Sequence, residues 1–347
     1  MSEWPFAPPI KPMKAKVRVN PPEPPGWVYE PKWDGFRAIA WSGDEPRLDS
    51  RSLKPLLRYF PELAPALDQL PPGTVVDTEI VVIVNDVTDF SALQQRIHPA
   101  ESRINMLADT TPAEIVAFDL LAGHGEDIRH HPYEERRRRL EKLFAGLDAP
   151  WHLTPVTRDL EEARRWFDEF ESAGCDGIIV KNVTEPYVED KRNWIKWKHR
   201  RDADCVVGGY RVHKDGDKIG SILLGLYNEE GRLSFIGHCS GFSDHDRTEL
   251  LKQFEQIRTD ESFGGYGEEE AGVRVPGAQS RWSGGKNMDW VPVEPGVVVQ
   301  ISYDQLEGNR FRHTTRFERW RPDKPPEECT FDQLVRPEGT GFSEVVS

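Results

Sequence analysis

The chain is organised around one stretch, Glu30-Pro31-Lys32-Trp33-Asp34-Gly35-Phe36-Arg37. Two short apolar segments, residues 27–29 and 36–41, flank its centre and are typical of strands, and Asp34-Gly35 is a strong turn signal. The pattern predicts a hairpin with Lys32, Asp34 and Arg37 close together at one end. A lysine amine beside other cations can lose its proton near neutral pH and become a nucleophile, and an arginine can hold a phosphate. An exposed hairpin with ordinary surface charges is the alternative, since short motifs have many false positives.

Two acidic residues interrupt the strongest predicted strand, residues 74–84. Asp77 and Glu79 stand in an otherwise β-branched run, where acids are normally depleted. Carboxylates are costly to bury in a strand unless they meet a cation or a hydroxyl group. The segment therefore predicts either a functional Glu79 or a turn with solvated acids.

Lysines and a tryptophan share one face of another predicted strand. In residues 192–198, strict alternation places Trp194, Lys196 and Lys198 on the same side. Such a face suits a polyanion, and the alternative is a half-exposed edge strand protected by its lysines. Residues 176–181, just before, predict a turn and a buried strand that ends in a lysine.

An aromatic residue and an arginine run leave two further questions open. Phe118, near the end of the predicted strand 114–121, belongs to the core or offers a flat platform for a base. The predicted helix 133–144 carries four consecutive arginines, 136–139, which cannot share one helix face. We expect most of them to be solvated and paired with neighbouring glutamates, and a DNA-backbone contact remains the alternative.

The composition is that of a globular protein with two domains. The 347 residues suffice for two domains of roughly 150 to 200 residues each, and no apolar run approaches the ~20 residues needed to cross a bilayer. Prolines interrupt the N-terminus where a signal peptide would be apolar, so we expect no export. The four cysteines lack Cys-x-x-Cys spacing and suggest free thiols in a reducing cytoplasm. A net charge of -14 argues mildly against binding DNA through overall charge, but allows a local basic groove.

The pattern changes near residue 201. The preceding part mixes strands and helices, and the following part predicts five strands and one helix, an arrangement that suits a small closed β-barrel such as the OB-fold. The predicted elements of this second part are strands 206–213, 219–227, 233–239, 297–306 and 312–320, with a helix at 243–257.

Seven motifs now occur in the order of the covalent nucleotidyltransferases: Lys-x-Asp-Gly-x-Arg, Ser-Arg, Asp-x-Glu, Phe-Asp, Asp-Gly-Ile-Ile-Val-Lys, Lys-x-Lys and Arg-x-Asp-Lys. That superfamily contains ATP-dependent DNA ligases, RNA ligases and mRNA capping enzymes. Over residues 23–329 the chain most resembles compact bacterial ATP-dependent DNA ligases of the C type. Two positions depart from the pattern, because Thr78 replaces a usual glycine and Asp176 replaces a usual glutamate.

The resemblance implies an α+β architecture in two parts. Residues 1–201 would form a nucleotidyltransferase (adenylation) domain with antiparallel sheets and flanking helices, and residues 202–347 would form an OB-fold domain. No separate N-terminal DNA-encircling domain is expected, because Lys32 comes so early.

The resemblance also implies the reaction. Lys32 would attack the α-phosphate of ATP, release pyrophosphate and keep AMP as a phosphoramidate. The adenylate would pass to the 5′-phosphate of a nick, and the neighbouring 3′-hydroxyl would displace AMP and seal the strand. Lys196, Lys198 and a divalent metal, Mg²⁺ or Mn²⁺, would neutralise the phosphate and help to lower the pKa of Lys32.

The remaining site residues carry over motif by motif. In the first domain the nucleotide contacts would be Glu30 and Phe118 at the adenine, Arg37, Arg51 and Glu79 at ribose and phosphate, Lys181 at the α-phosphate, and Arg192 near Lys198. The metal ligands would be Asp34, Glu79 and Asp176. In the second domain, Arg316, Arg321, Asp323 and Lys324 would close over the triphosphate and later rotate away about a hinge near residues 199–204.

Three other functions stay open: an mRNA-capping-type guanylyltransferase that uses GTP, an RNA ligase, and a non-catalytic nucleic-acid binder. For the ligase we expect a monomer that binds nicked double-stranded DNA and no membrane. We expect it in the bacterial cytoplasm, associated with the nucleoid. By family analogy, end-joining or excision-repair proteins would be its partners.

Overall fold

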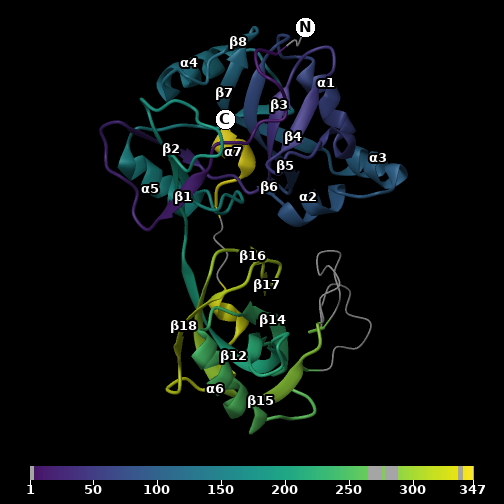
Figure 1. The fold of residues 1–347 in the computed structure, drawn as a ribbon, viewed down its shortest axis with the longest axis vertical. Coiled ribbons are helices and arrows are strands. Elements are labelled where there is room, and N and C mark those ends of the chain that lie inside the picture. Colours follow the sequence, from purple (N-terminus) through teal and green to yellow (C-terminus); the bar gives the residue numbers. More distant parts are fainter. Residues whose placement is uncertain (1–3, 265–275, 278–287, 335–338, 347) are drawn as a thin grey trace. The chain divides into compact units, whose positions relative to one another are not determined.

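The computed structural model describes residues 4–264, 276–277, 288–334 and 339–346. The chain divides into two compact units, the first formed by residues 1–199 and 337–347 and the second by residues 200–336 (Figure 1). The sequence places the last residues in the second domain, whereas the structure joins residues 337–347 to the first unit. None of the helices within these described ranges is long and apolar enough to cross a membrane.

A seven-stranded sheet forms the centre of the first unit. Its main strand order is β4-β3-β5-β7-β8, with β6 paired to β5 and β9 paired to β7. All pairs are antiparallel except β7 with β9. The predicted strand 74–84 is confirmed as β5. The bounds are β3 Phe36–Trp41, β4 Arg47–Ser50, β5 Val75–Val84, β6 Val87–Thr88, β7 Ala113–Gly123, β8 Glu126–Asp127 and β9 Trp151–Leu153.

A four-stranded sheet completes the first unit, in the order β1-β11-β10-β2. Since β11 pairs with both β1 and β10, it is an interior strand, and the edge-strand alternative for its lysines is wrong. The bounds are β1 Ala15–Arg18, β2 Trp27–Pro31, β10 Ile178–Asn182 and β11 Trp194–Trp197.

The hairpin predicted around Asp34-Gly35 is wrong. The strand before this turn, β2, pairs with β10, whereas the strand after it, β3, pairs with β4 and β5. The segment from Lys32 to Gly35 therefore crosses from one sheet to the other. Each strand pairs with strands from elsewhere in the chain, and those pairings override the local turn signal.

The predicted alternation of β11 is confirmed. Trp194 packs with Phe118 of the seven-stranded sheet, whereas Ile195 and Trp197 pack with Tyr29 on the other side. One face of the four-stranded sheet thus lies against the seven-stranded sheet, and this face is the one that carries Lys196.

Helices cover both sheets. Helix α2 begins after its N-cap Asp89, whose side chain accepts a hydrogen bond from Ala92 N at 2.9 Å. The chain around Pro61 forms two short 3-10 helices and one short α-helix in place of a single long helix. The bounds are η1 Leu57–Tyr59, η2 Pro61–Leu63, α1 Ala64–Leu67, α2 Phe90–Arg96, α3 Glu101–Thr110, α4 Tyr133–Phe144 and α5 Leu160–Glu169.

The arginine run of α4 is not uniformly solvated. Arg136 is fully buried and binds Asp119 through two bonds of 2.8 Å, and Arg137 is buried as well, so the expectation that most of the run is solvated is wrong. Arg138 and Arg139 do pair with Glu135, as predicted. The amphipathic helix turns one end of the run towards β7, where a buried carboxylate compensates the charge.

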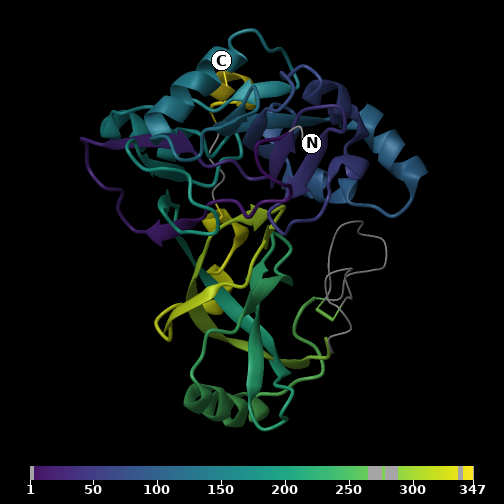
Figure 2. The same ribbon diagram turned by 45° about the horizontal axis from the view of Figure 1, so that its top comes forward.

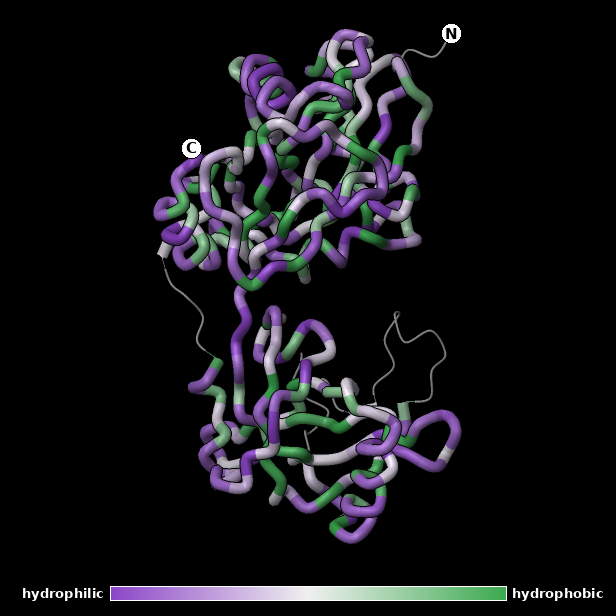
Figure 3. Tube along the Cα trace, turned by 60° about the vertical axis from the view of Figure 1, so that its left-hand side comes forward, coloured by the Kyte–Doolittle hydropathy of each residue, from purple (hydrophilic) through white to green (hydrophobic). Residues whose placement is uncertain are grey.

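The second unit is a five-stranded antiparallel sheet, β14-β13-β12-β15-β18, with α6 beside β13. A bridge between Cys239 and Thr315 brings the two end strands together, consistent with an OB-fold barrel. Residues 198–202, at the unit boundary, are strongly hydrophilic (Figure 3). The bounds are β12 Arg201–Val212, β13 Ile219–Tyr227, β14 Leu233–Cys239, α6 Asp244–Glu255, β15 Val291–Tyr303, β16 Leu306–Glu307, β17 Arg310–Phe311, β18 Arg316–Trp320, η3 Pro326–Glu328 and η4 Phe331–Gln333.

Candidate active site

Lys32 lies directly after β2, where the chain leaves the four-stranded sheet. Its backbone N–H donates to the carbonyl of Gly177 at 2.8 Å, and its carbonyl accepts from the N–H of Asp176 at 2.9 Å. A Cβ atom on Gly177, whose φ is +129°, would lie 2.2 Å from the Trp197 carbonyl oxygen. Only glycine fits this crossing of three chain segments, which fixes Lys32 beside the motif that begins at Asp176.

Asp176 connects two lysines. Its carboxylate lies 2.5 Å from the Lys32 amine through one oxygen and 2.9 Å from the Lys198 amine through the other. Burial alone would raise the pKa of Asp176, but the two lysines outweigh it, and the pKa is lowered. Although Asp176 is one methylene shorter than the glutamate usual at this position, it reaches both cations.

The pKa of Lys32 is shifted in the direction opposite to the prediction. Burial lowers it, but the carboxylates of Asp176, Glu79 and Asp34 outweigh burial, so the pKa of Lys32 is raised. The sequence predicts a lowering by neighbouring cations. The structure surrounds the amine with acids as well, and these stabilise the ammonium form.

Glu79 comes from β5 and reaches the segment that carries Lys32. Its Oε1 accepts a hydrogen bond from Gly35 N at 3.1 Å. Burial raises the pKa of Glu79 to about 8, although Lys32 and Arg37 act to lower it. A carboxyl group of this kind changes protonation near neutral pH, which suits proton transfer.

Asp77, the second acid of β5, is bound by a cation and by a hydroxyl group, which compensate its burial. Asp77 is fully buried, accepts two hydrogen bonds from Arg37 at 2.9 and 2.6 Å, and accepts one from the Tyr187 hydroxyl at 2.6 Å. The Arg37 guanidinium also lies 4.8 Å from the Trp194 ring centre and 5.4 Å from that of Phe118. Arg37 is thus held between the two sheets.

Lys181 and Glu30 form a second buried ion pair, on the face of the four-stranded sheet that also carries Lys196. Their charged atoms are 2.7 Å apart, the Tyr133 hydroxyl donates to Glu30, and the Lys181 amine donates to the Phe118 carbonyl at 2.8 Å. Lys181 is only 1% exposed. The Lys181 amine also lies 5.1 Å from the centre of the Phe118 ring. Lys181 and Lys32 therefore have different acidic partners, Glu30 and Asp176.

Three further predicted residues differ in exposure. Lys196 is partly buried, and its pKa is lowered. Burial is the main cause, and the positive charges of Lys198, Lys32 and Arg51 add to it. Arg51 and Arg192 are exposed. The structure therefore brings Arg51 into the electrostatic neighbourhood of Lys196 and leaves Arg192 on the surface.

The predicted metal ligands do not form one coordination group. Asp34 and Glu79 both act on Lys32, but both oxygens of Asp176 face lysine amines. Within the described ranges, no group of three or more His, Cys, Asp or Glu side chains is placed to hold a metal ion. Asp176 therefore does not fit a metal-ligand role in this arrangement, whereas Asp34 and Glu79 retain the donor type that Mg²⁺ prefers.

The predicted residues of the second unit lie on and after β18. Arg321 binds Asp204 through bonds of 3.0 and 2.8 Å and also binds Asp323. Lys324 lies 3.8 Å from Glu328, and Arg316 is exposed. These contacts give the loop after β18 a defined shape around Arg321.

The sequence did not indicate several residues that hold the site together. Tyr133 and Tyr187 supply hydroxyl groups to buried acids, and Asp119 neutralises Arg136. Each lies far in the chain from its partner, or on another element, so no local spacing predicts the contact. Only the cost of burying an acid in a strand indicates that a partner must exist.

The fold and the charged site define a covalent nucleotidyltransferase. A family model for the ATP dependent DNA ligase domain matches residues 9–198, and one for the ATP dependent DNA ligase C terminal region matches residues 215–324. The chain therefore belongs to the ATP-dependent DNA ligase family, as the sequence predicts.

Known relatives agree with this assignment. DNA ligase C of Mycobacterium tuberculosis is 48% identical, over 99% of this chain and 99% of its own length. The Multifunctional non-homologous end joining protein LigD of Pseudomonas aeruginosa is 31% identical, over 97% of this chain and 38% of its own length. A solved structure of a Lig E DNA ligase aligns with a TM-score of 0.55 at 15% identity, covering 91% of this chain and 100% of that one, and it shows likeness of fold alone.

Proposed function

We propose that this chain seals nicks in duplex DNA with ATP, through AMP bound covalently to Lys32. One observation carries the proposal: the Lys32 amine is held at 2.5 Å by Asp176, which also holds Lys198 at 2.9 Å. A nucleophile and a phosphate-binding cation are thereby positioned together, and positioning of this kind supplies much of the rate in phosphoryl transfer.

The first step needs the neutral amine of Lys32. The acids around Lys32 raise its pKa, and Lys196, Lys198 and a bound divalent metal would favour the loss of its proton. A bond then forms between the amine nitrogen and the α-phosphorus of ATP, the bond from that phosphorus to the bridging oxygen breaks, and pyrophosphate leaves with the electron pair. Lys196 and Lys198 stabilise the negative charge on the phosphate.

The later steps transfer and release the nucleotide. The 5′-phosphate of the nick attacks the α-phosphorus and frees the Lys32 amine, and then the 3′-hydroxyl attacks the adenylated 5′-phosphate and releases AMP. Of the remaining residues, we assign nucleotide binding to Glu30, Arg37, Arg51, Phe118, Lys181 and Arg192, and triphosphate binding to Arg316, Arg321, Asp323 and Lys324.

A divalent metal, Mg²⁺ or Mn²⁺, would be held by Asp34 and Glu79 together with the phosphates of ATP, because Mg²⁺ commonly takes only one or two protein carboxylates. When bound it would neutralise charge on the phosphates.

A local group of cations on the second unit supports DNA binding in a protein of net charge -14. Arg211 and Arg310 both lower the pKa of His238, which together with burial falls to about 4. Burial also lowers the pKa of Arg211, and its Nε atom is buried without a hydrogen-bond partner. Two arginines close together on the surface of one unit suit a phosphate backbone. By analogy with the end-joining relative, we place the enzyme in DNA repair as a monomer in the bacterial cytoplasm, at the nucleoid, with end-joining or excision-repair proteins as partners.

The test is to label the protein with α-labelled ATP or GTP in Mg²⁺ and then add nicked DNA duplex. We expect label from ATP alone, lost as sealed strand appears. Label from GTP would instead support a capping guanylyltransferase, and label released only by nicked RNA would support an RNA ligase. DNA binding without any labelled protein would support a non-catalytic binder.

A further inference from the structure

The last described residues, 339–346, pack against the first unit (Figures 1 and 2). They include the short helix α7, Phe342–Val346. Phe342 and Val345 are 3% and 2% exposed, and both belong to a core cluster with Trp33. The tail therefore contributes to the core directly behind the residue that follows the nucleophile.

The turn between β5 and β6 anchors this tail. The carbonyl of Asp86 accepts from Phe342 N at 2.6 Å, and its carboxylate accepts from Ser343 N and Ser343 Oγ, both at 2.9 Å. A Cβ atom on Gly341 would lie 1.9 Å from the Asp86 carboxylate, so the two chain segments touch. A further bond of 2.8 Å joins Ser172 Oγ to the Thr340 carbonyl. Four bonds from two separate segments hold a stretch of eight residues.

Trp33 is fixed from two sides. Its indole N–H donates to Thr154 Oγ1 at 2.9 Å, and its ring meets the Phe342 ring edge-on with centres 5.4 Å apart. Phe342 is itself packed against His152, at 5.0 Å between ring centres. Edge-to-face pairs of this kind have a defined geometry as well as an apolar contribution.

We propose that Phe342 is a positioning residue for the first step, because it fixes Trp33 and so the adjacent Lys32 amine. The amine must meet the α-phosphorus of ATP in line with the leaving pyrophosphate, and a displacement of about 1 Å can cost a hundredfold in rate. Since the tail follows the second unit along the chain, the support behind the nucleophile comes from residues more than 300 positions after it. This inference rests on the proposed function of Lys32.

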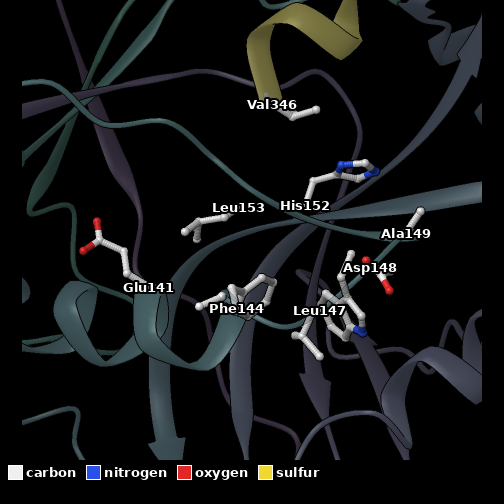
Figure 4. A pocket seen from close by; sticks show the side chains of 10 residues that line it. Glu141, Phe144, Leu147, Asp148, Ala149, His152, Leu153 and Val346 are labelled. Carbon is white, nitrogen blue, oxygen red and sulfur yellow. The ribbon is translucent and has the colours of Figure 1, made fainter.

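A matched control is available in the same unit. Phe144 of α4 is 8% exposed and belongs to a different core cluster from Trp33. It lines a cavity of about 390 Å³ together with Val346 of α7 (Figure 4). Phe144→Ala therefore removes another buried ring close to the tail, in a different part of the core from Trp33.

The experiment compares Phe342→Ala with Phe144→Ala in the full chain. Single-turnover formation of the lysyl-AMP is measured against ATP concentration, and sealing of a nick that already carries the 5′-adenylate is measured separately. For Phe342→Ala we expect lysyl-AMP formation to slow about tenfold at saturating ATP, with the KM for ATP and the sealing of adenylated nicks within about twofold of the wild type. For Phe144→Ala we expect a similar loss of thermal stability and no selective loss of the first step.

Equal loss of both activities in the two variants, or an unchanged first step in Phe342→Ala, would overturn the proposal. If Phe342→Ala does not fold, Asp86→Gly replaces it, because glycine tolerates the φ of +62° at this position while removing both carboxylate contacts to the tail. Asp86→Gly should slow the first step about threefold with the sealing of adenylated nicks unchanged, and proportional loss of both would again contradict the proposal. Adenylation that persists in Lys32→Ala would instead refute the proposed function itself.

Discussion

Asp176 holds the amine of the proposed nucleophile, Lys32. It is buried, and it binds the amines of both Lys32 and Lys198. A buried carboxylate that pairs with two partly buried cations cannot be neutralised without leaving both of them partly unpaired. The shorter side chain at this position is therefore compatible with the same electrostatic role as a glutamate.

We predict that Asp176→Asn slows lysyl-AMP formation about a hundredfold, because a neutral amide cannot hold both lysines. Asp176→Glu should stay within about tenfold of the wild type, since it keeps the charge and adds one methylene. Single-turnover labelling with α-labelled ATP measures both. Asp190→Asn, which alters an exposed partner of Lys14, serves as the control. A fully active Asp176→Asn would show that the pairing does not position the nucleophile.

His238 makes the second unit sensitive to acid. Burial and the nearby Arg211 and Arg310 lower its pKa to about 4 from an ordinary value of 6.5. Between these two pH values the unfolded chain binds a proton at this position that the folded chain does not, so the free energy of unfolding falls as the pH falls from 6.5 to 4.

We predict that His238→Gln loses less stability than the wild type over this range, by on the order of 2 kcal/mol at pH 4. Glutamine has no charge to gain and can still bond the Thr314 hydroxyl, which lies 3.1 Å from His238 Nε2. Urea unfolding at several pH values measures the difference. His245→Gln, at an exposed position of α6, should follow the wild type; equal acid sensitivity of His238→Gln would contradict the prediction.

At the scale of elements, the crossing between the two sheets places the site. Gly35 lies in this crossing, and a Cβ atom there would stand 2.2 Å from the Ile80 carbonyl oxygen and 2.9 Å from Glu79. The close approach lets Gly35 N donate a hydrogen bond to the Glu79 carboxylate, which joins the acid of β5 to the loop that follows Lys32.

We predict that Gly35→Ala lowers the free energy of unfolding by about 2 kcal/mol and slows lysyl-AMP formation at least tenfold, because the loop must move away from β5. Gly146→Ala, where nothing lies within 4 Å of an added Cβ, should do neither. Thermal unfolding and single-turnover labelling test the pair. Wild-type behaviour of Gly35→Ala would mean that the loop adapts without cost.

The elements show what the sequence could and could not predict. The helix of residues 133–144 and the face of β11 that carries Lys196 follow from local periodicity, and both are confirmed. The predicted hairpin is wrong because the pairing of β2 and β3 with other strands outweighs the turn signal of Asp34-Gly35. For Asp77 the sequence predicted only that a buried acid needs a partner, and it did not identify Arg37. A sequence shows which group is costly to bury, but not which residue lies opposite it in the fold.

At the scale of the whole molecule, an acidic chain must hold a polyanion. The net charge of -14 repels DNA at long range, so binding depends on local cations such as those around Arg211. The described second unit places this group on β12, β14 and β17, and the proposed nucleotide contacts of this unit lie on and after β18.

We predict that Arg211→Ala weakens binding to nicked duplex of any sequence and reduces the slope of log affinity against log salt by about 1, as expected for one lost phosphate contact. Arg232→Ala, which alters an exposed arginine already paired with Glu230, should leave the slope unchanged. Titration by fluorescence anisotropy at several salt concentrations measures both. An unchanged slope for Arg211→Ala would remove this group from the DNA-binding surface.

The central claim is that AMP is carried on the Lys32 amine. The most direct measurement is to incubate the protein with Mg²⁺ and ATP, digest it, and locate the adenylated residue by mass spectrometry, with Lys32→Arg treated in parallel. We expect AMP on the peptide that contains Lys32, through a bond that acid cleaves and alkali does not, and no adenylate on Lys32→Arg. AMP found on Lys196, Lys198 or any other residue, or an adenylate that forms on Lys32→Arg, would contradict the account.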